Sequence, residues 1–414
     1  MASRPAAVSP ARAAAFAVLL RVFEDDAYAD RALRRAASDL DERDRGLAQR
    51  LAYGAVQRVR TLDHAIELLG RRRIARLDAP VRAALRLGAY QLAFVDGVAR
   101  YAAVNESVEL VRRAGLERAV AFTNAVLRRL AEGIAPLLDS LPEDTPAAAA
   151  LKHSYPDWIA ESWWSEWGPD EARALMLALN EPASTMVRLV RGELDGVADP
   201  EIPGAWRVAR IDEGAFSDGR IWPQSAASQL AGLAVRAEEG DRTLDLCAAP
   251  GGKASMLSGE VTAVERNEGR ARELEENLRR LGASNVRVVV ADGRNLPASL
   301  RDFDRALVDA PCSGLGVLNR RPDLRWRAMP LPELQLELLR SAAERVRPGG
   351  TIVYSVCTTT SEECEDVVDA LGLPVDSTLS EEWPTFRHRR RPEFLQTLPH
   401  VHSTAGFFIA RLRV

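Results

Sequence analysis

Two cysteines are the residues of this sequence best suited to covalent chemistry. Cys312 and Cys357 each follow a short apolar run, at 306–309 and 351–355, that predicts a β-strand. A thiolate is a strong nucleophile, but a free thiol is only a few per cent ionised at neutral pH, so the site must lower its pKa or remove its proton during attack. A buried, inert cysteine is the commoner situation. Two cysteines at neighbouring strand ends favour a reactive site.

A turn rich in small residues follows another predicted strand, 243–246. Small residues and paired glycines let a ligand approach the backbone at the sheet edge where doubly wound folds bind ligands. The turn is not a phosphate-binding P-loop, because Cys247 replaces a required glycine and Ala254 a required serine or threonine, and it does not fit G-x-G-x-x-G. It predicts a nucleotide-type pocket. The candidate cofactor-binding residues of the turn are Cys247, Ala248, Ala249, Pro250, Gly251, Gly252 and Lys253.

Acidic residues stand at four successive predicted strand ends, Asp245, Glu265, Asp292 and Asp309. One strand-end carboxylate alone is usually just solvated, but four should face one crevice, because the carboxyl ends of parallel strands meet at one edge. An acid that ends the second strand can accept hydrogen bonds from a ribose diol. The set suits a ligand with a ribose, an adenine amine and a cationic centre, and we expect S-adenosylmethionine as the cofactor.

Cysteines beside a methyl donor indicate methylation of cytosine at C5. That carbon is too weak a nucleophile to attack a sulfonium methyl group, but a thiolate that adds to C6 converts the ring into an enamine and activates C5. After the transfer, the C5 proton is removed and the enzyme is eliminated. Asp309 could hydrogen-bond the N3 edge or the exocyclic amine and help the protonation that the addition requires. These residues leave open whether Cys312 or Cys357 is the nucleophile.

The predicted secondary structure that must position these residues changes along the chain, from helices alone to strands that alternate with helices. Apolar residues at helical spacing predict an all-α domain at 1–135, and the proline-rich stretch 136–150 predicts a linker. A small α+β subdomain is expected at 151–235. From 236 to 414, apolar runs alternate with helical stretches, which predicts a Rossmann-like, doubly wound domain with a largely parallel sheet. Its last strand, near 406–412, is expected to be antiparallel.

Composition and charge bound the class of protein. The 414 residues are 47% hydrophobic, enough for ordinary buried cores. Residues 1–135 carry 23 basic and 16 acidic side chains, net +7, whereas residues 136–414 carry net −11. The basic end suits nucleic acid, although a coding bias toward arginine explains the enrichment equally well. Four cysteines without a CxxC pair and no apolar run of ~20 residues indicate a reducing, cytoplasmic location with no metal and no membrane span.

The motifs resemble those of the Sun/Fmu (RsmB) RNA 5-methylcytosine methyltransferases, over roughly residues 150–414. The similar motifs are 245–253, 309–314, 321–323, Trp326, 354–358, Glu362, Glu363 and 406–408. The amino-terminal region resembles NusB, an RNA-binding helical domain, at 51–56, 87–92 and 124–128. The sequence departs from the family pattern at Val190 and Ser225, where the family has asparagine and aspartate; these positions bear on RNA contacts.

The resemblance implies a NusB-like helical bundle ahead of a methyltransferase domain that acts on a cytosine of 16S ribosomal RNA, either free or in a partly assembled small subunit. It implies that Cys357 is the nucleophile and that Cys312 assists release of the methylated base, with Asp309 beside them. It also implies that residues 247–253, Glu265, Asp292 and Asp309 hold S-adenosylmethionine. We expect the protein to act as a monomer.

Arginines are the candidate RNA contacts, although a charge run is more often a solvated face. They are Arg71, Arg72, Arg73 and Arg188. Two alternatives remain: the same chemistry on transfer RNA, another RNA or DNA, or a non-catalytic RNA-binding or ribosome assembly factor with a vestigial methyltransferase fold. The intact turn, the strand-end acids and both cysteines favour an enzyme.

Overall fold

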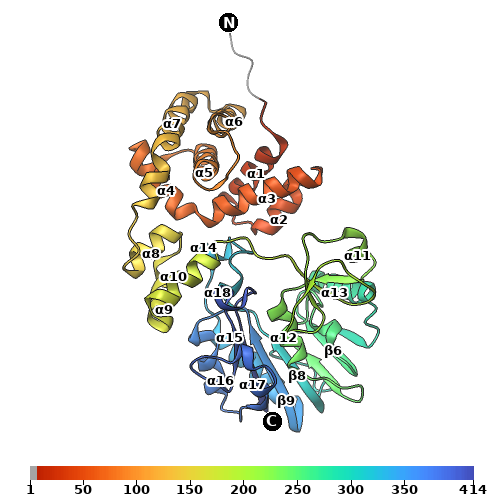
Figure 1. The fold of residues 1–414 in the computed structure, drawn as a ribbon. Helices are drawn as coiled ribbons and strands as arrows, with labels where there is room; N and C mark the ends of the chain where they lie inside the picture. Colours follow the sequence, from red (N-terminus) through yellow and green to blue (C-terminus); the bar gives the residue numbers. More distant parts are fainter. Residues whose placement is uncertain (1–6) are drawn as a thin grey trace. The chain divides into compact units, whose positions relative to one another are not determined.

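The computed structural model describes residues 7–414, which form two compact units (Figure 1). The first contains residues 7–180 together with the short segment Leu318–Arg327, and the second contains Glu181–Val317 and Ala328–Val414. Within residues 136–150, one helix continues to Asp139 and the next begins at Pro146. The domain boundaries expected at 135, 150 and 235 stay a prediction.

The first unit is all-α, as the apolar spacing predicts. Asp41 caps one helix by accepting a hydrogen bond from the Asp44 backbone N–H, and alanine-rich faces let the helices pack closely. A Cβ added at Gly54 would lie 1.9 Å from the Tyr90 ring, so only glycine fits there. The helices are α1 Pro10–Glu24, α2 Ala29–Ala36, α3 Glu42–Gln57, α4 Val59–Gly70, η1 Ile74–Arg76, α5 Ala79–Phe94, α6 Arg100–Arg113, α7 Glu117–Asp139, α8 Pro146–His153, α9 Asp157–Trp167, α10 Pro169–Ala178 and α14 Leu324–Arg327.

The segment Leu318–Arg327 is anchored in this unit by a buried arginine. The Arg325 guanidinium donates to the Ser154 carbonyl and to Asn180 Oδ1, both at 2.9 Å, and lies 3.7 Å from the centre of the Tyr155 ring. Trp326 Nε1 donates to the Val56 carbonyl at 2.8 Å. The bonds of Arg325 offset the cost of burying its guanidinium charge without a carboxylate partner.

The second unit begins with a small four-stranded antiparallel sheet in the order β2-β3-β1-β4. The larger sheet has seven strands in the order β10-β11-β9-β8-β5-β6-β7 and is parallel except for β10 and β11. The strands are β1 Met186–Leu189, β2 Val197–Ala198, β3 Ala205–Arg207, β4 Ile221–Pro223, β5 Arg242–Asp245, β6 Glu260–Glu265, β7 Val286–Val290, β8 Phe303–Asp309, β9 Val346–Val356, β10 Leu395–Thr397 and β11 Phe407–Arg413.

Helices connect the strands of the larger sheet and pack on it. Strands such as β6 are buried along nearly their whole length. Because both of their faces are covered, they appear in the sequence as continuous apolar runs. The expected fold class, a helical bundle followed by a Rossmann-like sheet, is confirmed. The helices of this unit are α11 Glu213–Ser217, α12 Ala226–Leu233, η2 Ala254–Met256, α13 Glu268–Leu281, η3 Leu315–Val317, α15 Pro332–Ala343, η4 Ser361–Glu363, α16 Glu365–Leu371, α17 Thr378–Glu382, η5 Pro384–Phe386 and α18 Pro399–His402.

The order of the larger sheet fixes where a ligand can bind. β5 pairs in parallel with β6 on one side and with β8 on the other, so the connections run outward in opposite directions from this point. In doubly wound sheets, ligands bind beyond the carboxyl ends of the strands at such a switch point. The turn at 247–253, Glu265 and Asp309 all stand at or just after those strand ends.

No helix within residues 7–414 is both long and apolar enough to cross a membrane. The same residues contain no cluster of three or more histidine, cysteine, aspartate or glutamate side chains that could hold a metal ion.

Candidate active site

The structure brings the two cysteines into contact. β8 and β9 are neighbouring parallel strands, and the chain segments that leave their carboxyl ends place Cys312 Sγ 3.3 Å from Cys357 Sγ. Both side chains are half-buried. Cys357 follows β9 directly, and its carbonyl accepts a hydrogen bond from the Gly316 N–H at 2.9 Å. The contact therefore joins two residues 45 positions apart in the sequence.

The contact between the two sulfurs affects the ionisation of Cys312. The hydrogen bond with Cys357, followed by burial, raises the pKa of Cys312 well above its ordinary value. The Cys312 thiol is therefore harder to ionise than an ordinary cysteine. A third cysteine, Cys247, also has a raised pKa, because burial and then the charge of Asp245 oppose its ionisation. Cys247 is thus a poor candidate for a nucleophile.

Asp309, at the end of β8, is held by two partners. Lys253 Nζ lies 2.7 Å from its Oδ2, and Ser355 Oγ donates to its Oδ1 at 2.7 Å. The Lys253 ammonium also lies 5.3 Å from the centre of the Phe407 ring, and Phe407 packs against Cys357. The carboxylate of Asp309 is therefore fixed on the side of the sheet edge where the cysteines meet.

Asp245, at the end of β5, has an unsatisfied oxygen. Its side chain is buried, and its Oδ2 has no hydrogen-bond partner anywhere in residues 7–414. Burial, and secondly the charge of Asp309, raises the pKa of Asp245 to about 7. A buried polar atom without a partner is costly, so this oxygen is available to a hydrogen-bond donor of a ligand. In the turn that follows, Gly251 adopts φ +108°, a conformation that favours glycine, and a Cβ there would lie 2.9 Å from Leu274 Cδ1.

Glu265 and Asp292, the other two strand-end acids, are engaged by neighbouring groups. Glu265 is buried at the end of β6 and accepts a hydrogen bond from the Asn267 N–H at 2.9 Å. Asp292 pairs with Arg294, whose Nη2 lies 2.7 Å from its Oδ2, and this hydrogen bonding lowers the pKa of Asp292 to about 2. Arg294 in turn contacts Glu337 at 3.2 Å.

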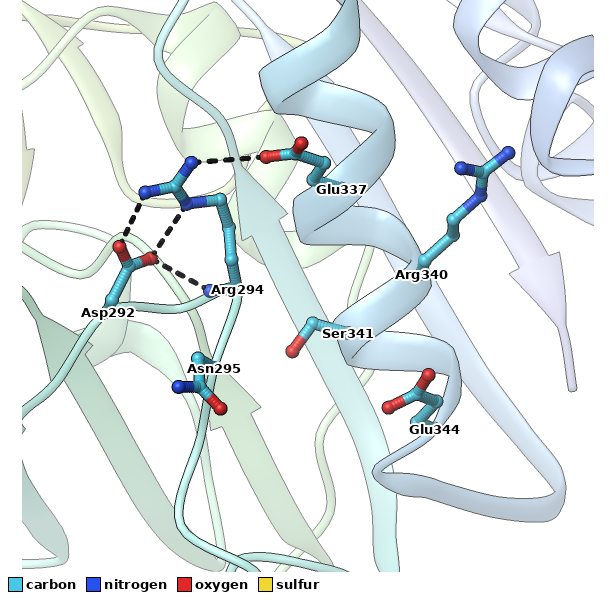
Figure 2. A pocket seen from close by; sticks show the side chains of 7 residues that line it. All are labelled: Asp292, Arg294, Asn295, Glu337, Arg340, Ser341 and Glu344. Carbon is cyan, nitrogen blue, oxygen red and sulfur yellow. Dashed lines mark hydrogen bonds and ion pairs between the residues drawn. The ribbon is translucent and has the colours of Figure 1, made fainter.

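Asp292 lines an open hollow of about 540 Å³. Figure 2 shows its carboxylate turned toward Arg294. Neither cysteine of the contacting pair lines this hollow. The hollow is lined by Asp292, Arg294, Asn295, Glu337, Arg340, Ser341 and Glu344.

The candidate RNA-binding arginines occupy different environments. Arg188, on β1, is buried and donates to Ser255 Oγ at 2.7 Å, and burial lowers its pKa to about 10. It therefore lies beside the glycine-rich turn rather than on an open surface. Arg71, Arg72 and Arg73 are exposed in the helical unit, and Arg72 lies 5.5 Å from the centre of the Phe122 ring. These three are accessible to a polyanion.

Two polar residues that sequence patterns do not assign to the site are buried next to Cys312. Gln335 is on α15 and Glu363 is on η4, and neither is exposed. Glu363 stands in a motif that carries the family resemblance, but no chemical role follows from its position. No pattern singles out Gln335, because one glutamine among the apolar residues of a helix looks like an ordinary surface residue.

Comparison with known proteins identifies two similar families. Residues 232–413 match the family described as 16S rRNA methyltransferase RsmB/F, and residues 9–132 match the NusB family. The chain is 33% identical to a probable ribosomal RNA small subunit methyltransferase B of Synechocystis sp., over 97% of this chain and 99% of the relative. It is 39% identical to ribosomal RNA small subunit methyltransferase B of Thermus thermophilus, over 87% of this chain and 86% of the relative.

One solved structure with a similar fold is NSun6 from Pyrococcus horikoshii with SFG. It aligns with a TM-score of 0.56 at 23% sequence identity, over 63% of this chain and 98% of that one.

Proposed function

The chain belongs to the RsmB/F family of 16S rRNA methyltransferases, and from this premise we propose that it methylates C5 of a cytosine in small-subunit ribosomal RNA, with S-adenosylmethionine as methyl donor and Cys357 as covalent nucleophile. The observation that carries the proposal is the 3.3 Å contact between Cys312 Sγ and Cys357 Sγ beside Asp309. A site for methyl transfer without covalent activation would need no pair of sulfurs at the ligand-binding edge.

The residues at the switch point fit S-adenosylmethionine. The buried Oδ2 of Asp245 has no partner in residues 7–414 and can accept a hydrogen bond from a ligand at this strand end. We assign the cofactor to residues 247–253, Glu265, Asp292 and Asp309. Asp292 would have to exchange its bond with Arg294 for one with the ligand. When bound, the cofactor supplies an electrophilic methyl group on a sulfonium. The structure of NSun6, which has a similar fold, was solved with SFG, an analogue of S-adenosylmethionine.

The chain's own residues perform the remaining steps. Cys357 Sγ, as thiolate, adds to C6 of the cytosine, and Asp309 orients the N3 edge, which takes a proton from solvent during the addition. After methylation, Cys312 assists release. Once it has given its own proton to solvent, its thiolate takes the C5 proton and the C–H electron pair forms the C5–C6 double bond. Cys357 leaves C6 as a thiolate, and the proton gained at N3 returns to solvent. The raised pKa of Cys312 makes its thiolate a stronger base than an ordinary one.

A substrate assay tests the function directly. Purified protein, tritium-labelled S-adenosylmethionine and small-subunit ribosomal RNA, either free or in partly assembled particles, should give labelled 5-methylcytidine after nuclease digestion. Transfer RNA and large-subunit ribosomal RNA are the comparison substrates. Label in a different nucleoside would overturn the chemistry, and preference for transfer RNA would overturn the substrate.

The ionisation of Asp245 predicts a pH dependence of cofactor binding. Because its pKa is raised to about 7, the carboxyl is mostly neutral below that pH and mostly anionic above it, and the anion favours a cationic ligand. Affinity for S-adenosylmethionine should therefore rise about tenfold between about pH 6 and pH 8, with release of a proton. Calorimetry on the wild type and on Asp245→Asn separates this effect from the ligand's own titration. An equal pH dependence in both proteins would exclude Asp245 as its source.

The exposed arginines predict the salt dependence of RNA binding. If Arg71, Arg72 and Arg73 each contact a phosphate, replacing all three with alanine should reduce the slope of log K against log salt concentration by about 2, at about 0.7 per contact on single-stranded RNA. Filter binding over a salt series measures the slope, and Arg272→Ala, an exposed arginine on α13, is the control. An unchanged slope would show that the three arginines do not contact RNA phosphates.

A further inference from the structure

Cys312 is held by hydrogen bonds on both sides. Gln335 Nε2 donates to the carbonyl of Pro311 at 2.9 Å, and the N–H of Ser313 donates to Glu363 Oε1 at 3.0 Å. Gln335 and Glu363 are themselves bonded, with Nε2 2.9 Å from Oε1. One connected pair of side chains therefore fixes the residue before and the residue after Cys312.

The pair is fully buried and is itself fixed. Glu363 Oε1 also accepts a hydrogen bond from the Leu331 N–H at 3.0 Å, and the hydroxyl of Tyr354 donates to the Glu363 carbonyl at 2.6 Å. Gln335 and Glu363 both have 0% exposure. A buried carboxylate held only by N–H donors is expensive compared with an apolar side chain of similar size, so packing alone does not account for it.

The two cysteines depend on different supports. Cys357 directly follows β9, which is paired on both sides by β8 and β11, so the sheet fixes the nucleophile. Cys312 lies beyond the end of β8 at Asp309, outside the ladder of strand hydrogen bonds. Its position must therefore come from other bonds. The Gln335–Glu363 pair bonds the backbone on both sides of Cys312, and Ser313 Oγ also lies 2.9 Å from Thr358 Oγ1.

We propose that Gln335 and Glu363 are positioning residues for Cys312: by clamping its two neighbouring peptide groups, they hold its sulfur against that of Cys357 for the release step. The inference rests on the proposed function. In that step, the C5 proton passes to the Cys312 thiolate, the C–H electron pair forms the C5–C6 double bond, and the Cys357 Sγ–C6 bond breaks with its electrons on sulfur. Misplacement of Cys312 slows proton removal and leaves addition at C6 intact.

The test compares the formation and the release of the covalent adduct in the full-length protein with small-subunit ribosomal RNA and S-adenosylmethionine. Adduct is measured on denaturing gels over time. Glu363→Ala should form adduct at the wild-type rate but release it between about tenfold and 100-fold more slowly, because small displacements of a catalytic group have effects of this size. Glu363→Gln should release within about threefold of wild type, since one amide oxygen can replace Oε1.

Further variants separate positioning from stability. Gln335→Leu removes the bond to Pro311 while keeping most of the volume, and it provides the test if Glu363→Ala fails to fold. Gln229→Leu, at a fully buried glutamine on α12, is the matched control and should leave the ratio of adduct formation to release unchanged. The initial affinity for RNA, measured before adduct forms, should not change in any of these variants.

The outcomes are distinct. Slower release with unchanged adduct formation in Glu363→Ala and Gln335→Leu supports the inference. Wild-type release, or equal slowing of formation and release, overturns it while leaving the proposed function intact. If Cys312→Ala itself accumulates no adduct, Cys312 does not assist release of the methylated base. The inference about Gln335 and Glu363 is then overturned as well.

Discussion

Replacing Cys357 with alanine should abolish both methyl transfer and the covalent adduct, with turnover reduced by at least about 10⁴-fold. The physical reason is that cytosine C5 becomes nucleophilic only after a thiolate has added to C6, and Cys357 is the sulfur that β9 fixes at the ligand-binding edge. Transfer of tritium to RNA measures the first effect. A denaturing gel with labelled RNA measures the second.

The matched control is Cys364→Ala. Cys364 is buried in the core of the same unit, and its Sγ lies 4.0 Å from the Thr358 carbonyl. This variant should lose some stability through the small cavity but keep methyl transfer, because its sulfur is not part of the contacting pair. Persisting turnover in Cys357→Ala would move the nucleophile to Cys312.

Replacing Cys312 with alanine should give the opposite phenotype: a protein–RNA adduct that survives denaturation and accumulates in the presence of S-adenosylmethionine. Of the two cysteines, only Cys357 is needed for addition at C6. Release requires a base beside the adduct, and Cys312 Sγ lies 3.3 Å from the sulfur that must leave. Loss of a general base slows a step by about 10²- to 10⁴-fold. Pulse-chase of labelled RNA measures the rate at which the adduct disappears.

The double variant Cys312→Ala/Cys357→Ala is the control for this result, since it should form no adduct. Accumulation in Cys357→Ala together with loss of adduct in Cys312→Ala would exchange the two roles. Rapid release from the Cys312→Ala adduct would show that another group removes the C5 proton.

The sequence was sufficient to predict the strands, the helices and the sheet edge at which the acids and the cysteines stand. Apolar periodicity is a local property, so strands such as 286–290 and helix 268–281 could be located without knowledge of their neighbours. The turn at 247–253 was recognisable because paired glycines after a strand have few other uses. Since parallel strands end at one edge, the acids and the cysteines could be expected near each other. The cofactor and substrate assignments depended on the family resemblance.

Only the tertiary structure determined which side chains contact each other and which are buried. The sequence could not predict that Arg188 is buried against Ser255, or that Asp292 pairs with Arg294 in a separate hollow. Nor could it predict the bond between Lys253 and Asp309, residues 56 positions apart, or the clamp on Cys312 formed by Gln335 and Glu363. Hydrogen bonds and ionisation depend on burial and on distances of a few ångströms between remote parts of the chain, and only the packed fold sets those quantities.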